Sequence, residues 1–146
     1  MNNIKVMLSS NSMEWGTPQD LYDQLNTEFN FTLDPCATKE NAKCKKYYTK
    51  ENNGLTLSWQ GETVFCNPPY GREIKLWVEK CYYEYTLNKT KIVMLIPSRT
   101  DTAYFHKYIY NRQKIEIRFI RGRIKFVGEQ KGSGSAPFPS MIVIFK

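Results

Sequence analysis

Hydrophobic residues recur at two spacings along the chain, and these predict helices and strands in alternation. Intervals of three and four residues are typical of amphipathic helices, and they occur at 18–29, 74–85 and 102–109. Alternating or continuous apolar runs are typical of strands, and they occur at 29–33, 45–49, 63–66, 91–96, 115–120, 123–126 and 141–145. The alternation favours a single α/β domain over residues 15–146, with a mostly parallel sheet.

The C-terminal strands predict an antiparallel hairpin that closes one edge of this sheet. The connection at 128–135 is rich in glycine and serine. We expect it to be either a spacer or a mobile loop that becomes ordered on a substrate. Residues 1–14 are polar and uneven, and they are expected to form a loose N-terminal arm.

The start of the first helix has a recognisable capping pattern. Thr17 is the predicted N-cap, Pro18 takes the favoured first helical position, and Asp20 suits the first turn. Capping explains Thr17 and Pro18 without any ligand. It does not explain Trp15, a large aromatic residue just ahead of the helix.

The formal net charge of +7 on 146 residues favours a polyanionic partner, and nucleic acid is the commonest one. The alternative is a surface charge that only promotes solubility. No apolar run approaches the ~20 residues of a membrane span, and the first residues lack the apolar region of a signal peptide. We therefore expect a cytosolic protein without a membrane partner.

The cysteines do not predict a metal site. The chain has four of them and a single histidine, His106, and no two cysteines have CxxC spacing. They are expected to be reduced and mostly buried, at the positions Cys36, Cys44, Cys66 and Cys81.

The strongest candidate for chemistry is the loop Asn67-Pro68-Pro69-Tyr70, which follows an apolar strand and precedes a helix. The consecutive prolines stiffen the loop and remove two N–H donors. It therefore presents acceptors, the Asn67 amide oxygen and the Pro68 carbonyl, beside the aromatic face of Tyr70. Such a set suits a planar ring that carries an amino group. The alternative is a turn that merely ends the strand.

Two acidic positions are candidates for a cofactor corner. Asp34 stands where the strand at 29–33 gives way to the small-residue loop Pro35-Cys36-Ala37, as in doubly wound folds. A simple Asp-Pro turn is the alternative. Glu51 follows the next predicted strand, where an acidic residue is placed to bind ribose hydroxyls, but it is equally compatible with a solvated loop charge.

Several short motifs, taken in order, resemble the phage-type DNA N6-adenine methyltransferases of the Dam type. They cover nearly all of residues 13–146, and the ordered set is more specific than any one motif. The matching stretches are Trp15-Gly16-Thr17-Pro18, Leu33-Asp34-Pro35-Cys36-Ala37, Asn53-Gly54-Leu55, Asn67-Pro68-Pro69-Tyr70-Gly71, Ile96-Pro97-Ser98-Arg99-Thr100-Asp101-Thr102, Gly122-Arg123-Ile124-Lys125-Phe126 and Ala136-Pro137-Phe138-Pro139-Ser140.

The resemblance implies a Rossmann-like fold that binds S-adenosyl-L-methionine. By this analogy the cofactor-binding residues are Trp15, Thr17, Pro18, Asp34, Cys36, Ala37, Glu51, Asn53 and Leu55. One departure matters. Many methyltransferases have a glycine-rich loop after the first strand, whereas this chain has Asp-Pro-Cys-Ala. The resemblance therefore defines the cofactor contacts on that side less closely than it defines the catalytic loop.

The implied reaction is methyl transfer to the exocyclic N6 of adenine in DNA, in the cytoplasm of a bacterial host cell. Asn67 and the Pro68 carbonyl would accept hydrogen bonds from N6–H, Pro69 would stiffen the loop, and Tyr70 would stack on a flipped base. DNA contacts are expected from the basic residues Arg72, Arg99, Arg121, Arg123, Lys125 and Lys131. The sequence leaves open whether the protein is a monomer or a homodimer.

Two other classes of function remain open at this stage. The same loop is compatible with an RNA adenine methyltransferase or a protein glutamine methyltransferase. The second class is a basic nucleic-acid-binding module that keeps the fold without catalysis. The intact loop disfavours the binding module, and the basic charge disfavours a protein substrate.

Overall fold

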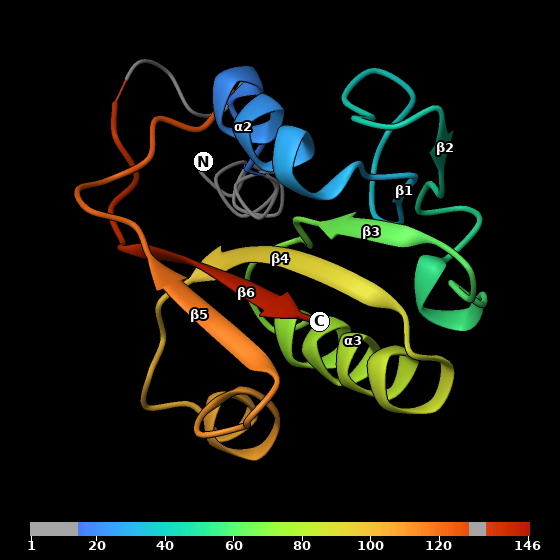
Figure 1. The fold of residues 1–146 in the computed structure, drawn as a ribbon. Coiled ribbons are helices and arrows are strands. Elements are labelled where there is room, and N and C mark those ends of the chain that lie inside the picture. The colour runs from blue at the N-terminus through green and yellow to red at the C-terminus, as the bar shows by residue number, and fades with distance from the viewer. Residues whose placement is uncertain (1–14, 129–133) are drawn as a thin grey trace, which may run out of the picture.

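The computed structural model describes residues 15–128 and 134–146 and contains one six-stranded sheet with the order β2-β1-β3-β4-β6-β5 (Figure 1). Neighbouring strands from β2 to β4 are parallel, whereas β6 is antiparallel to both of its neighbours, β4 and β5. The strands are β1 (Leu33–Asp34), β2 (Lys46–Tyr47), β3 (Thr63–Cys66), β4 (Lys91–Pro97), β5 (Ile115–Phe119) and β6 (Ser140–Phe145). The predicted α/β sheet, mostly parallel with a C-terminal antiparallel hairpin, is thus confirmed.

Helices cover both faces of the sheet (Figure 1). Helix α2 (Gln19–Phe29) lies on one face, while α3 (Ile74–Asn88) and the short π-helix η2 (Phe105–Ile109) lie on the other. A 3-10 turn, η1 (Gly54–Thr56), precedes β3. The helix predicted at 102–109 is confirmed, because residues 103–104 are α-helical and continue directly into η2. In the described part of the chain, no helix is long and apolar enough to span a membrane.

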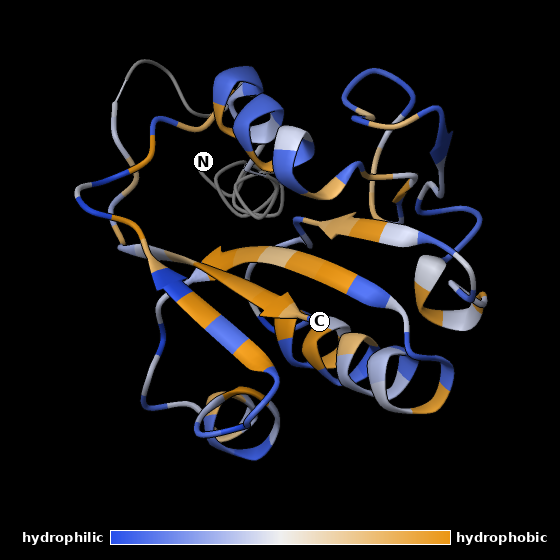
Figure 2. Ribbon diagram, in the orientation of Figure 1, coloured by the Kyte–Doolittle hydropathy of each residue, from blue (hydrophilic) through white to orange (hydrophobic). Residues whose placement is uncertain are grey.

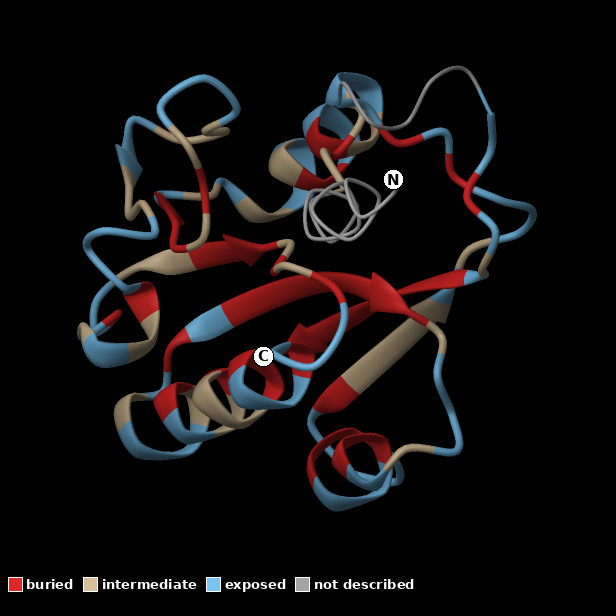
Figure 3. Ribbon diagram, turned by 180° about the vertical axis from the view of Figure 1, so that it is seen from behind, coloured by how far each residue is buried: buried red, intermediate tan, exposed pale blue. Residues whose placement is uncertain are grey.

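The core is centred on β4 and β6, the most hydrophobic strands of the sheet (Figure 2). Every residue of β6 is buried, and in β4 only Lys91 is exposed. Seen from behind, these two strands form a continuous buried band between the helical layers (Figure 3). The edge strand β5 is less buried, because β6 is inserted between it and β4. This rigid centre fixes the positions of the loops at the strand ends.

Three predicted strands differ from the structure. The one at 45–49 is reduced to Lys46–Tyr47 in β2. Helix α2 extends through Phe29, and Asn30 ends it with a left-handed φ of 58°, so β1 contains only Leu33–Asp34 instead of 29–33. Residues 123–126 form no strand. The carbonyl oxygen of Ile124 accepts a hydrogen bond from the Ala136 backbone N, and an isolated bridge to Gly16 follows at Val127.

Thr17 is not the N-cap that the sequence predicts. Helix α2 begins at Gln19, with extended Pro18 as its N-cap, and no side chain caps the helix. Thr17 is nevertheless only 3% exposed. Its hydroxyl bonds to Asn67 instead, far along the sequence.

The strand order reverses between β1 and β3. From β1 the chain continues to β2 on one side, whereas β3 lies on the other side of β1 and leads on to β4. In open α/β sheets, ligands bind outside the carboxyl ends of the strands at such a switch point. Here Asp34 is the last residue of β1 and is followed by Pro35-Cys36, while Asn67-Pro68 follows β3.

Candidate active site

A cleft of about 1150 Å³ lies at the carboxyl ends of β1 and β3. Small-molecule pockets usually measure about 300–1,000 Å³, so the cleft has room for more than one small ligand. Five segments that are distant in sequence contribute to its lining, within 15–17, 34–43, 49–55, 65–77 and 127–128. The sequence predicts both strand-end loops at this position, but not residues 127–128.

The amide of Asn67 is held in one orientation. Its Nδ2 donates hydrogen bonds to the Trp15 carbonyl oxygen at 2.5 Å and to Thr17 Oγ1 at 2.9 Å. A carbonyl oxygen only accepts hydrogen bonds, so the NH₂ group has to face Trp15. Oδ1 consequently points the other way and accepts a hydrogen bond from the Tyr70 hydroxyl at 2.8 Å.

Tyr70 supports this arrangement from beneath the loop. Its hydroxyl lies 2.8 Å from Asn67 Oδ1 and 3.1 Å from the Leu95 carbonyl oxygen, so one proton serves two acceptors. Burial raises the pKa of Tyr70 well above its usual value. The residue therefore remains a phenol at neutral pH and continues to donate.

The ring of Tyr70 belongs to an aromatic cluster and offers little free surface, with 5% exposed. Trp15 lies nearly parallel to it, with ring centroids 6.4 Å apart. Phe126 and Phe138 contact both rings edge to face, at 5.0–6.0 Å. We call Trp15, Tyr70, Phe126 and Phe138 the aromatic cluster. Both phenylalanines lie in stretches that carry the family resemblance, but the sequence does not identify either as a site residue, because their contacts with Trp15 and Tyr70 are long-range.

The N-terminal segment is attached to the C-terminal one beside this cluster. Gly16 and Val127 exchange two backbone hydrogen bonds, of 2.9 and 2.8 Å. A Cβ atom on Gly16 would lie 2.6 Å from the Val127 carbonyl oxygen, so only glycine permits this approach. The bridge therefore fixes the backbone on which Trp15 and Thr17 are carried.

Asp34 organises the loop after β1. It is 5% exposed, and its Oδ2 accepts a hydrogen bond from the Lys43 backbone N at 3.0 Å. Burial raises the pKa of Asp34 to about 6, although the backbone N–H groups of Lys43 and Cys36 act in the opposite direction. The carboxyl group thus ties the two ends of the 36–43 loop to the end of β1.

The raised pKa of Asp34 predicts a specific dependence of stability on pH. The folded protein binds a proton at Asp34 more tightly than the unfolded chain does, so this group stabilises the fold below about pH 4 and loses that contribution as pH rises through about 6. Asp34→Asn lacks this titration. Urea unfolding should show the wild type losing up to about 3 kcal/mol relative to Asp34→Asn between pH 4 and 6.5. Parallel stability curves would contradict this.

The turn at η1 forms the opposite side of the cleft. Gly54 and the half-buried Leu55 line it, as does Asn53, whose Oδ1 accepts a hydrogen bond from the Leu55 backbone N at 3.2 Å. A Cβ on Gly54 would lie 2.2 Å from the Pro35 carbonyl oxygen. The η1 turn and the loop after β1 are therefore in direct backbone contact.

The other predicted cofactor residues differ in their placement. Cys36 and Ala37 line the cleft, whereas Pro18 and Glu51 are absent from its lining and Glu51 is exposed.

The Cys36 and Cys66 sulfurs lie 3.6 Å apart, and burial raises the pKa of both thiols. Among the described residues, no group of three or more histidines, cysteines or acids is arranged to hold a metal ion.

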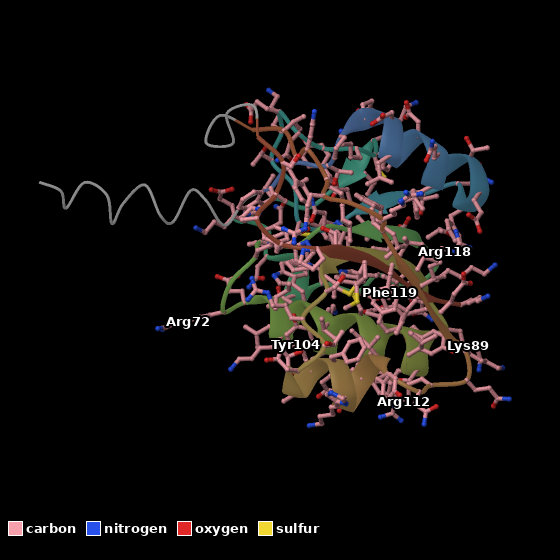
Figure 4. The ribbon with its side chains drawn as sticks, turned by 90° about the vertical axis from the view of Figure 1, so that its left-hand side faces the viewer. Arg72, Lys89, Tyr104, Arg112, Arg118 and Phe119 are labelled. Atoms are coloured by element: carbon pink, nitrogen blue, oxygen red, sulfur yellow. The ribbon has the colours of Figure 1, made fainter. Side chains whose placement is uncertain are left out.

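Five of the six predicted DNA contacts are exposed: Arg72, Arg99, Arg121, Arg123 and Lys125. None of these five forms an ion pair with a described residue. Arg72 lines the cleft and projects away from the body of the protein (Figure 4). Lys131, the sixth, lies outside the described residues.

The amino-acid sequence is similar to a known family model and to known proteins. The family model for DNA N-6-adenine-methyltransferase (Dam) matches residues 6–146. A DNA N-6-adenine-methyltransferase of Haemophilus phage HP1 is 32% identical over 136 residues, which cover 90% of this chain and 78% of that protein. A protein of the same name from Escherichia phage T1 is 33% identical over 103 residues, covering 69% of this chain and 42% of that protein. The chain therefore belongs to the phage-type DNA N-6-adenine-methyltransferase (Dam) family.

Proposed function

We propose that this protein transfers a methyl group from S-adenosyl-L-methionine to the N6 atom of adenine in DNA. Family membership supports the reaction class. The observation that carries the proposal is the fixed orientation of the Asn67 amide, which lines the cleft at the end of β3. Its Oδ1 accepts one hydrogen bond from the Tyr70 hydroxyl and has a second lone pair for another donor. An acceptor at this position suits an amino group as the reacting nucleophile.

The two acceptors of the Asn67 loop make the N6 amino group of adenine more nucleophilic. The N6 lone pair is delocalised into the adenine ring and is a poor nucleophile. Hydrogen bonds from N6–H to Asn67 Oδ1 and to the Pro68 carbonyl favour a pyramidal nitrogen with a localised lone pair. These acceptors are preorganised, so the stabilisation is electrostatic and requires no side chain with a shifted pKa as general base. After N6 has taken the methyl group it is positively charged, and it then releases one proton to water.

The cleft fits a cofactor beside the target base. Its volume of about 1150 Å³ exceeds that of usual single-ligand pockets, and it lies at the switch point of the sheet, as in Rossmann-like folds. Cys36, Ala37, Asn53 and Leu55 line the side expected to hold the cofactor. When bound, S-adenosyl-L-methionine supplies an electrophilic sulfonium methyl group, and the chain contributes mainly the alignment of N6 with that group.

Adenine has to leave the duplex to reach Asn67, because N6 is paired and stacked within it. We propose that the base enters beside the aromatic cluster, where the half-buried ring of Trp15 provides a flat surface for stacking. The ring of Tyr70, which the sequence analysis assigned to that role, is buried behind Trp15 and supports the site through its hydroxyl instead. The exposed basic residues, with Arg72 at the rim of the cleft, would bind phosphates. Phosphate contacts position the duplex and carry no direct sequence information.

The substrate class is tested by transfer of labelled methyl from S-adenosyl-L-methionine to unmethylated DNA, RNA and protein in parallel reactions. We expect label in DNA alone, with an apparent affinity that falls steeply as salt concentration rises, because the contacts are to phosphates. Label confined to RNA would mean that the protein catalyses the same methyl transfer with RNA, not DNA, as its substrate. Label confined to protein would refute the nucleic-acid assignment.

A further inference from the structure

We infer that Thr17 is a positioning residue, which acts together with the Trp15 carbonyl oxygen to hold the Asn67 amide with Oδ1 toward the reacting base. The inference rests on the proposed function for its catalytic meaning. Its structural basis is the pair of hydrogen bonds from Nδ2, at 2.5 Å to Trp15 O and 2.9 Å to Thr17 Oγ1. Both protons of the amide are thus used on one side.

The clamp formed by these two acceptors selects one of two amide orientations. A half-turn of the Asn67 amide would place Oδ1 beside the Trp15 carbonyl oxygen, so that two acceptors would face each other without a proton. It would also break the bond that Oδ1 accepts from the Tyr70 hydroxyl. In the flipped orientation the group presented to adenine N6–H is a donor, and the nucleophile is not activated.

The surroundings of the clamp make it rigid. Thr17 is only 3% exposed, so water competes little for its hydroxyl. The paired backbone bonds between Gly16 and Val127 hold the segment in place on one side. Pro18 fixes φ at the start of α2 on the other side. A residue at the beginning of the domain thereby controls a side chain that follows β3.

This role differs from the capping and cofactor contacts that the sequence predicts for Thr17. A residue that binds the cofactor changes KM for the cofactor when it is replaced. A residue that acts only through Asn67 changes kcat, and it has no further effect once Asn67 itself is removed. The two roles therefore give different results in a double-mutant cycle.

The kinetic test compares Thr17→Val, which keeps the shape and loses the acceptor, with Thr17→Ser, which keeps the hydroxyl. We expect Thr17→Val to lower kcat about tenfold, with KM for DNA and for the cofactor changed by less than about twofold. Thr17→Ser should restore most of kcat. In the Asn67→Ala background, Thr17→Val should cause no further loss. An equal loss in that background, together with a higher KM for the cofactor, would overturn the inference.

Thr27→Val is the matched control, because Thr27 bonds to the Asp23 carbonyl on the exposed side of α2, away from the cleft. It should leave kcat and both KM values unchanged. A loss of kcat in Thr27→Val as large as that in Thr17→Val would also overturn the inference, since the effect would then not depend on the clamp.

A second measurement does not depend on activity. In the ¹⁵N-labelled protein, the side-chain amide signals of Asn67 are assigned by their loss in Asn67→Ala. We expect both amide protons to exchange slowly with water in the wild type and in Thr17→Ser, and one of them to exchange faster in Thr17→Val. Identical exchange in the wild type and Thr17→Val would refute the clamp, even if the wild type methylates DNA. Absence of DNA methylation by the wild type, with protected amide protons, would instead refute the proposed function alone.

Discussion

Asn67→Ala is expected to lower kcat for DNA methylation by about 10²–10³, the range measured when one preorganised hydrogen-bonding group is removed from an active site. The substitution removes Oδ1, the acceptor that Trp15 and Thr17 hold in place. Because the loop retains both prolines and the Pro68 carbonyl, binding of cofactor and DNA should change little. Single-turnover kinetics with saturating cofactor separates the chemical step from binding.

Asn88→Ala is a suitable control for that experiment. Asn88 bonds to Glu84 at the end of α3, outside the cleft lining, so its removal should leave kcat unchanged. Asn67→Asp provides a sharper comparison, because it retains an acceptor oxygen but places the other oxygen against the Trp15 carbonyl. We expect Asn67→Asp to be impaired at neutral pH and to recover partly as pH falls, since the protonated acid again donates to that carbonyl. Full activity at neutral pH would contradict the geometry of the site.

Gly54→Ala is expected to reduce cofactor affinity by at least about tenfold and Tm by about 5–10 °C. The added Cβ would lie 2.2 Å from the Pro35 carbonyl oxygen and 3.2 Å from its carbon. These are backbone atoms, so the clash cannot be relieved by a change of side-chain rotamer. The η1 turn and the loop after β1 have to separate, and both line the cleft. Calorimetric titration with the cofactor, together with thermal unfolding, measures the two effects.

Gly134→Ala is the matched control for this substitution, because a Cβ at Gly134 would meet no atom within 4 Å. Its Tm and cofactor affinity should equal those of the wild type. If Gly54→Ala bound the cofactor as tightly as Gly134→Ala, the side of the cleft formed by η1 would not contribute to the cofactor site.

The parts of the site that the sequence could predict are those with a local signal. Asn67 and Asp34 each follow a run of apolar residues at a strand end, and a parallel sheet brings such ends to one edge. The closeness of Gly54 to Pro35 has no such signal. It results from the parallel pairing of β1 with β2 and β3, which no single segment determines.

Thr17 shows why the contacts between distant parts of the chain could not be predicted from the sequence. Its position before Pro18 favours a helix cap, and the local pattern contains nothing that contradicts this. In the structure its hydroxyl bonds to a residue 50 positions away. Similarly, Phe126 alternates as in a strand, but its segment pairs with Gly16 only through the bridge at Val127. Such long-range partners depend on how the two ends of the domain meet.

The Asn67 loop is the element that we propose to carry methyl transfer to adenine N6 in DNA. The most direct measurement is nucleoside analysis by mass spectrometry of DNA from a host that lacks adenine methylation and produces either the wild type or Asn67→Ala. We expect N6-methyldeoxyadenosine with the wild type and a level near background with Asn67→Ala. Methylated cytosine in place of methylated adenine, or equal N6-methyldeoxyadenosine from both proteins, would contradict this proposal.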